Sequence, residues 1–227
     1  HKQRGDAAQA IKSAPRKIAG HFEVGGQEQF YLEGQISYAI PGENNSMQVF
    51  CSTQHPSEMQ HHIAHCLNIP FNQVTVETRR MGGAFGGKES QSAIFACAAA
   101  IAANACAAPV KLRPDRDDDM LITGKRHDFS YDFEAGFDAT GLLLGVKFSL
   151  ISRAGYSADL SGPVAARALC HVDNAYYLSA VDVRVMAART NTQSNTAFRG
   201  FGGPQGALAI EYVLDTIAHE LGLDALE

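Results

Sequence analysis

The sequence lacks tryptophan, has no C-x-x-C pair and carries no excess of positive charge. With 19 basic against 24 acidic residues its formal net charge is -5, which provides no basic surface for nucleic acid and no polybasic patch for a membrane. The longest apolar run, residues 93–108, is alanine-rich, is interrupted by Asn104 and is too weakly hydrophobic to span a bilayer. We therefore expect neither a nucleic-acid nor a membrane partner, and we predict that this run forms a buried helix.

The cysteines form an odd-numbered set without metal-ligand spacing, which argues against a disulfide framework and against a zinc or iron–sulfur site. The chain begins at His1 and shows no export leader, so we expect a cytoplasmic protein with reduced structural thiols, and the chain could be a piece of a longer one. The five residues are Cys51, Cys66, Cys97, Cys106 and Cys170.

Hairpins and strand–helix units are mixed along the chain. The patterns predict strands over residues 48–53, 74–79, 110–113 and 181–187, and a hairpin of residues 131–137 and 142–151. Helices are predicted over residues 56–67, 90–107, 164–171 and 204–221, the last with Leu208, Tyr212, Ile217 and Leu221 available to a core. This mixture indicates an α+β fold with mixed sheets and packed helices, either one domain over residues 1–227 or two subdomains of about 1–113 and 114–227.

The first glycine loop, residues 82–89, reads Gly-Gly-Ala-Phe-Gly-Gly-Lys-Glu. Gly82 to Lys88 fits the phosphate-loop spacing G-x-x-x-x-G-K between a predicted strand and a predicted helix. That motif needs a Ser or Thr next, to bind magnesium, whereas this chain has Glu89, whose carboxylate would repel phosphates. We therefore do not expect nucleotide hydrolysis.

A second glycine loop, residues 196–206, also leads into a predicted helix, with Pro204 near its first turn. Glycines let backbone N–H groups approach an anionic or oxygen-rich ligand, and each helix N-terminus adds partial positive charge. Either loop alone is weak support for a site, but two such loops in one domain suggest a shared ligand.

Three long motifs carry a resemblance to a known family: residues 82–89, residues 166–174 with Ala-Arg-Ala-Leu followed by His-Val-Asp-Asn, and residues 194–205. Residues 30–35 and 123–127 are also typical of it. The chain resembles the molybdenum-containing hydroxylases, which include xanthine dehydrogenase and aldehyde oxidase. The resemblance implies a molybdenum–molybdopterin cofactor and assigns the chain to the first part of the cofactor-binding domain.

The resemblance implies that Gln54 donates its amide to the apical oxo group of molybdenum. It also implies that Phe85, Gly86 and Arg199 line the ligand sphere of the metal. Without the resemblance, Gln54 reads as a turn residue ahead of Pro56, and Phe85 as a loop anchor.

Glu89 and Arg167 match the purine-reading pair of the family, which would bind opposite ends of a flat substrate. Negative charge builds on the heterocycle during hydroxylation, and a fixed guanidinium can stabilise it. Phe201 and Phe198 resemble the aromatic residues that confine the ring in a slot. Taken alone, the two charged residues would be an ordinary helix-terminal carboxylate and a solvated helix cation, and the phenylalanines core residues.

The resemblance implies oxidation of hypoxanthine and xanthine to urate, a step of purine catabolism. The general base is expected beyond Glu227, so the isolated chain should be inactive. A [2Fe–2S] cluster and FAD are expected in other domains or subunits, and the protein is expected to be a homo-oligomer.

Three other interpretations stay open beside purine hydroxylation. Aldehyde oxidases share both glycine loops but typically carry apolar residues at the positions of Glu89 and Arg167, so the two charges favour purines over aldehydes or other N-heterocycles. A zinc protein could use His61, His62 and His65, although the glutamate of H-E-x-x-H is absent. A non-catalytic scaffold would leave the paired loops unexplained.

Overall fold

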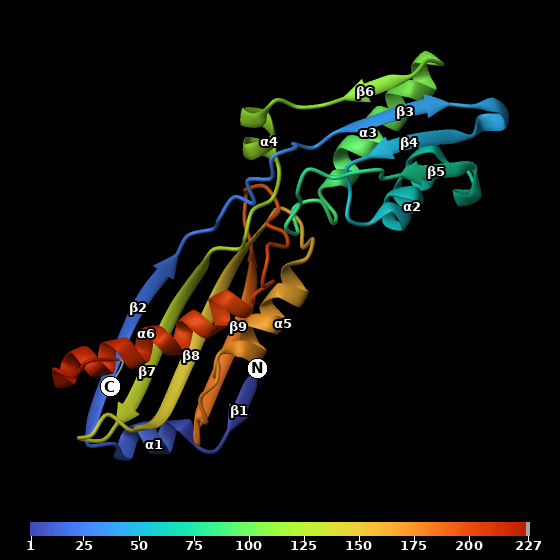
Figure 1. Ribbon diagram of the computed structural model, residues 1–227. Helices are drawn as coiled ribbons and strands as arrows, with labels where there is room; N and C mark the ends of the chain where they lie inside the picture. Colours follow the sequence, from blue (N-terminus) through green and yellow to red (C-terminus); the bar gives the residue numbers. More distant parts are fainter. Residues whose placement is uncertain (226–227) are drawn as a thin grey trace. The chain divides into compact units, whose positions relative to one another are not determined.

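The chain divides into two compact units in the computed structural model, which describes residues 1–225 (Figure 1). Unit 1 comprises His1–Gln27, His127–Thr192 and Gly200–Glu227, and unit 2 comprises Glu28–Arg126 and Gln193–Arg199. Both are mixtures of helices with a mixed sheet, so the predicted α+β class is confirmed. The sequence suggested a division near residue 113, but that position lies inside unit 2.

Unit 1 is built on a five-stranded sheet with the order β1-β9-β8-β7-β2. Its strands are β1 (Lys2–Arg4), β2 (Arg16–Val24), β7 (Phe129–Phe137), β8 (Leu143–Gly155) and β9 (Val181–Arg189), and its helices are α1 (Ala7–Ser13), α5 (Ser161–His171) and α6 (Gly203–Leu221). Strands β7 and β8 form the predicted hairpin, whose turn is fixed by the Asp138 carboxylate accepting N–H bonds from Thr140 and Leu142. Strands β8 and β9 are parallel, and α5 lies in the connection between them.

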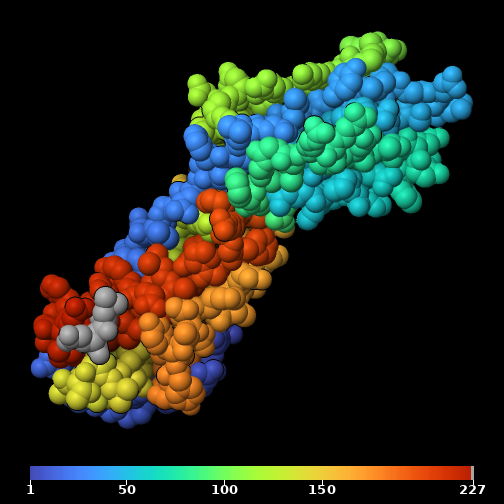
Figure 2. Space-filling view, viewed as in Figure 1, coloured from blue at the N-terminus to red at the C-terminus, as the bar shows by residue number. Residues whose placement is uncertain are grey.

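Helices α5 and α6 pack against each other on one face of this sheet (Figures 1 and 2). Two glycines make the close approach possible, because a Cβ at Gly202 would collide with the carbonyl oxygen of Val164, and one at Gly206 with that of Ala168. This contact fixes the rotation of α6, so the residues it buries include Ile210 and Ile217.

The core positions predicted on α6 are correct only in part. Ile217 is buried and Leu221 packs against the core, but Leu208 is 37% exposed and Tyr212 40% exposed. The Tyr212 ring instead stacks on Phe22 of β2, with 3.9 Å between ring centroids.

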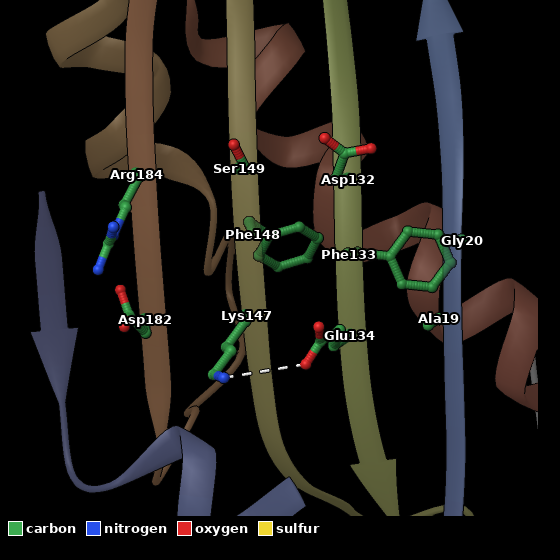
Figure 3. A pocket seen from close by; sticks show the side chains of 10 residues that line it. All are labelled: Ala19, Gly20, Asp132, Phe133, Glu134, Lys147, Phe148, Ser149, Asp182 and Arg184. Atoms are coloured by element: carbon green, nitrogen blue, oxygen red, sulfur yellow. Dashed lines mark ion pairs between the residues drawn. The ribbon is translucent and has the colours of Figure 1, made fainter.

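The other face of the unit 1 sheet is open and charged, as Figure 3 shows with the helices behind the strands. Charged side chains from neighbouring strands line a shallow pocket there, and Lys147 on β8 forms an ion pair with Glu134 on β7 at 3.8 Å. The alternation of these polar residues with buried Phe133, Val146 and Phe148 is the pattern of a sheet buried on one face.

Unit 2 has a four-stranded sheet with the order β5-β4-β3-β6. Its strands are β3 (Ser37–Pro41), β4 (Met47–Cys51), β5 (Val74–Glu77) and β6 (Val110–Leu112), and its helices are α2 (Pro56–Leu67), α3 (Ser92–Cys106) and α4 (Arg116–Ile122), with short 3-10 turns at Glu43–Asn45 and Phe71–Gln73. Strand β6 pairs with β3. That pairing ties the residues around position 113 to this sheet, which explains why no boundary lies there.

Helix α3 forms where the apolar run predicted it, but the helix is not buried on all sides. Alanines such as Ala96, Ala99 and Ala103 face α2 and the sheet, whereas Ile94 and Ile101 are each about half exposed, at 47% and 48%. Small residues on the buried face let the neighbouring elements approach closely. Within residues 1–225, the structure contains no helix with both the length and the apolar character needed to cross a membrane.

All five cysteines are free. Only Cys51 is buried, however, and Cys66, Cys106 and Cys170 are exposed. These three thiols are therefore not core residues, and of the four, Cys51 fits the structural role expected from the sequence best.

Candidate functional site

The first glycine loop meets residues 196–199 of the second glycine loop inside unit 2. The backbone N–H of Arg199, in the second loop, donates to the carbonyl oxygen of Phe85, in the first, at 2.9 Å. Gly86 has φ +104°, and a Cβ on it would lie 2.7 Å from the carbonyl oxygen of Ala197, so only glycine allows the two backbones to approach this closely. The loops thus form one structural feature.

Each loop also contains a phenylalanine whose backbone has a positive φ, followed by a glycine whose φ is also positive. Phe85 and Gly86 have φ 54° and 104°, and Phe201 and Gly202 have φ 52° and 98°. A bulky residue at positive φ is strained by about 1–3 kcal/mol, and such strain persists where the surrounding structure enforces it, often at functional sites. The strained backbone marks each turn, taken by itself, as a candidate for a functional role.

The amide of Gln54, which follows β4, is oriented by the first loop. Its Oε1 accepts the backbone N–H of Gly86 at 3.0 Å and that of Lys88 at 3.3 Å, while its own backbone N–H donates to the carbonyl oxygen of Lys88 at 2.9 Å. With the oxygen held by two donors, the Nε2 group is left as the donor end of the amide. Gln54 can therefore present N–H bonds to an oxygen-rich ligand.

Lys88 has a structural role that the sequence did not reveal. Its side chain is completely buried, and Nζ donates to the Glu33 carbonyl oxygen at 2.7 Å and to Ser52 Oγ at 2.9 Å, 4.6 Å from the centre of the Tyr31 ring. Burial lowers the pKa of Lys88, opposed by the Glu33 carboxylate, whose Oε1 lies 3.8 Å away. A lysine fixed in this way anchors the loop and cannot reach a phosphate.

ATP with magnesium should therefore leave the melting temperature of the protein unchanged. A ligand at 100 times its Kd would add about 2.7 kcal/mol to the free energy of unfolding, which thermal denaturation detects readily. The buried side chain of Lys88 is not available to bind a phosphate, and the carboxylate of Glu89 would repel one. A higher melting temperature with ATP and magnesium, but not with magnesium alone, would contradict this prediction and support a phosphate loop.

The remaining predicted residues of unit 2 lie on the same two loops. Glu89 is half-buried immediately after Lys88, Phe85 is 48% exposed, Phe198 is half-buried and Arg199 is exposed. The exposed guanidinium and the amide of Gln54 give this region a cationic and donor-rich character, which suits an anionic ligand rich in oxygen.

Arg167 and Phe201 belong to unit 1, where Arg167 lies in the second half of α5 and Phe201 lies two residues before α6. Arg167 is exposed on α5, and its carbonyl oxygen contacts His171 Nδ1 at 2.9 Å. Phe201 is half-buried against the unit 1 core, one residue before the glycine that packs on α5. The predicted site residues are therefore divided between the two units.

The histidines of the zinc interpretation do not assemble into a site. His61 lies against the Phe71 ring, with 5.2 Å between ring centroids, and His62 is 3.5 Å from Glu58 one turn earlier. Among residues 1–225 no group of three or more histidine, cysteine, aspartate or glutamate side chains could hold a metal ion.

Comparison with known proteins decides between the remaining families. Residues 1–227 match the family model of the molybdopterin cofactor-binding domain. The chain belongs to this family. The predicted resemblance to molybdenum hydroxylases is thereby confirmed along the whole chain.

Relatives of this molybdopterin cofactor-binding domain include enzymes with different substrates. It is 42% identical to a xanthine dehydrogenase of Drosophila subobscura over 224 residues, which is 99% of the chain and 17% of the relative. It is also 42% identical to a nicotinate hydroxylase of Emericella nidulans over 211 residues, 92% of the chain and 16% of the relative. The domain thus spans about a sixth of the length of these curated relatives.

Among solved structures, the aldehyde oxidoreductase of Desulfovibrio gigas has the same fold. The TM-score is 0.88 at 26% identity, over 99% of the domain and 25% of the other chain. The relatives and the structural neighbour thus include enzymes named for xanthine, nicotinate and aldehydes. The family is established, and overall similarity does not select the substrate.

The sequence did not single out two residues that shape the loops of this domain. Arg126 was noted only as part of a motif, and Lys88 only as an element of a phosphate loop. The burial of Lys88 could not be predicted from the sequence. Lysines are rarely buried without partners, and the partners of Lys88, such as Ser52, are distant in the sequence.

Proposed function

We propose that this molybdopterin cofactor-binding domain supplies the oxo-recognition and substrate-reading residues of an enzyme that hydroxylates hypoxanthine and xanthine to urate. The observation that carries the proposal is the hydrogen-bonded cluster at the first loop. Phe85 accepts from the Arg199 backbone, and Gly86 donates to the Gln54 side chain. The four residues assigned to the cofactor are therefore linked through two consecutive loop residues.

The side chains fit the cofactor that the family name implies. When bound, the molybdenum–molybdopterin group supplies the oxidising metal centre. Gln54 would donate its Nε2 hydrogens to an oxygen of that group, with the amide orientation held by Gly86 and Lys88. Gly86 keeps the loop free of side-chain atoms, and the exposed Arg199 would offset negative charge.

Glu89 and Arg167 would recognise the purine by hydrogen bonding. A carboxylate and a guanidinium recognise complementary ring N–H groups and carbonyl oxygens, and Arg167 would stabilise the negative charge that develops on the ring. Phe201 and Phe198 would confine the flat ring by aromatic contact. The two charges favour a purine over an aldehyde, which offers no ring nitrogens to pair with them.

A second candidate substrate class is another N-heterocycle. The nicotinate hydroxylase of Emericella nidulans is as similar to this domain as the xanthine dehydrogenases, at 42% identity. A pyridine carboxylate would use the cation at Arg167 but would be repelled by the carboxylate at Glu89. The presence of both charges therefore favours the purine.

We further propose that the domain works with other parts of a larger protein. It spans about a sixth of the curated relatives, which leaves room for the general base, a [2Fe–2S] cluster and FAD in other domains or subunits. A cytoplasmic homo-oligomer remains our proposal for the whole protein.

The purified protein that carries this chain should contain molybdenum and reduce an artificial dye when xanthine is added. Residues 1–227 expressed alone should be molybdenum-free and inactive, because a large pterin loses much of its enclosing surface and the general base is expected beyond Glu227. Elemental analysis and the dye assay check both. A metal-free whole protein contradicts the proposed function, and turnover by residues 1–227 alone contradicts the placement of the base.

A further inference from the structure

Arg126 makes three side-chain contacts with the second glycine loop, all within unit 2. The guanidinium lies over the Phe198 ring, with 4.1 Å between Cζ and the ring centroid. It also donates to the carbonyl oxygens of Phe198 at 3.4 Å and Arg199 at 2.9 Å. A planar guanidinium can do both at once, because its N–H donors lie in the plane and its cationic face lies above it. One side chain thus holds one ring and two consecutive carbonyl groups.

The backbone of Arg199 is consequently held from two directions. Its N–H donates to the Phe85 carbonyl oxygen at 2.9 Å, and its carbonyl oxygen accepts from Arg126. With both polar groups fixed, the conformations open to this residue are few. The direction in which the exposed Arg199 side chain leaves the loop is therefore set largely by Arg126 and the first loop.

The chain around Arg126 is joined to the same loop through its backbone. Arg126 and Thr196 form an isolated parallel bridge, the Thr196 N–H donates to the Lys125 carbonyl oxygen at 2.9 Å, and the Lys125 N–H donates to Asn195 Oδ1 at 3.2 Å. Burial lowers the pKa of Arg126, and the carbonyl groups and the ring compensate the cation for the water it has lost.

We infer that Arg126 is a positioning residue, which sets the Phe198 ring and the Arg199 side chain at the cofactor and substrate site. The inference rests on the proposed function, in which those two residues face the substrate and the cofactor. The Arg126 guanidinium itself is engaged with this loop. One face of Phe198 is covered by the guanidinium, so only its other face or its edge can meet a flat substrate.

The test compares Arg126→Met and Arg126→Lys with a matched control, Arg79→Met, in the whole protein. Arg79 lies in the same unit and also over an aromatic ring, 5.1 Å from the centroid of Phe50, but its guanidinium pairs with Glu77 at 2.6 Å. Hydrogen exchange over residues 194–201 is measured by mass spectrometry, together with kcat and KM for xanthine. Exchange needs no turnover, so it reports on the loop even if the proposed substrate is wrong.

Arg126→Met should speed exchange of residues 194–201 about tenfold or more, because two charge-assisted hydrogen bonds are lost. It should lower kcat/KM for xanthine by about 100-fold, mainly in kcat, since small misplacements of site groups are that costly. Arg126→Lys keeps the charge over the ring but not the two-pronged geometry, so its effects should be in the same direction and smaller. Arg79→Met should change neither.

Three results would overturn the inference. Unchanged exchange in Arg126→Met means that Arg126 does not fix the loop, and a uniform increase across both units means that its role is general stability. Faster local exchange with normal kcat and KM means that the position of this loop does not affect turnover. If the methionine variant does not fold, the lysine variant decides by the same criteria. A wild-type protein without purine turnover would instead refute the proposed function, whatever the exchange shows.

Discussion

The double variant Glu89→Val with Arg167→Met should lower kcat/KM for xanthine by on the order of 10⁴-fold, while aldehydes are oxidised as well as before or better. A site built to hydrogen-bond its substrate discriminates strongly, because its polar groups are left unpaired with the wrong one. Glu89 is half-buried beside the glycine loop of unit 2, and Arg167 is exposed on α5 of unit 1. Steady-state kinetics with xanthine and an aromatic aldehyde measure the change in preference.

The open face of the unit 1 sheet offers a matched control for this variant. Glu134→Val with Lys147→Met removes the same two charges from an exposed ion pair of 3.8 Å on the unit 1 sheet (Figure 3). Exposed pairs of this kind contribute at most about 1 kcal/mol to stability, so turnover of both substrates should stay at the wild-type level. Equal losses on xanthine and aldehyde in the Glu89 and Arg167 variant would remove both residues from purine recognition.

Gln54→Glu should lower kcat by about 10²–10³-fold without weakening the fold, the usual range for loss of one hydrogen-bond donor in a catalytic site. The new carboxylate can still accept the N–H groups of Gly86 and Lys88, which now bond to the amide oxygen at 3.0 and 3.3 Å. It can no longer donate to an oxygen of the cofactor and would repel one. The melting temperature should therefore hold or rise while turnover falls.

Gln48→Glu is the control for that variant, because Gln48 is exposed on β4 and the substitution adds the same charge to the strand that precedes Gln54. Kinetics, thermal denaturation and molybdenum content are measured for both proteins. Normal turnover in Gln54→Glu at full molybdenum content would rule out Gln54 as an essential donor. A large fall in its melting temperature would show that the loop does not accept the carboxylate.

Much of the fold follows from local signals in the sequence. The turn at Asp138 and the alternation in β7 and β8 predicted the hairpin, and the alanine-rich run predicted α3. Pro204 and the glycines before it marked the start of α6. These elements depend on short-range propensity and periodicity, which a single sequence contains.

Other features depend on contacts between distant segments. Strand β2 was not predicted, although Ile18, Phe22 and Val24 alternate toward the core, because Gly20 and polar neighbours weaken the pattern. The rotation of α6 was also misjudged, since it is set by the contact of Gly206 with α5 rather than by the strongest apolar residues of the helix itself. Pattern alone cannot supply such tertiary constraints.

The candidate site shows the same division. The family resemblance assigned roles to Gln54, Phe85 and Arg199, and the structure adds how the loops hold them. The roles of Lys88 and Arg126 could not be inferred, because each acts through groups more than 30 residues away in the sequence, such as Ser52 and Phe198. Contacts between such distant residues produce no recognisable motif in the sequence.

A structure of the whole protein with its cofactor and xanthine bound tests the central claim most directly. The account predicts that the Glu89 carboxylate and the Arg167 guanidinium each lie within about 3.2 Å of a ring nitrogen or an oxygen of the bound purine. Gln54 Nε2 should donate to an oxygen of the molybdenum group over a similar distance. A purine contacted by neither charged residue, with the cofactor remote from Gln54, would contradict the account.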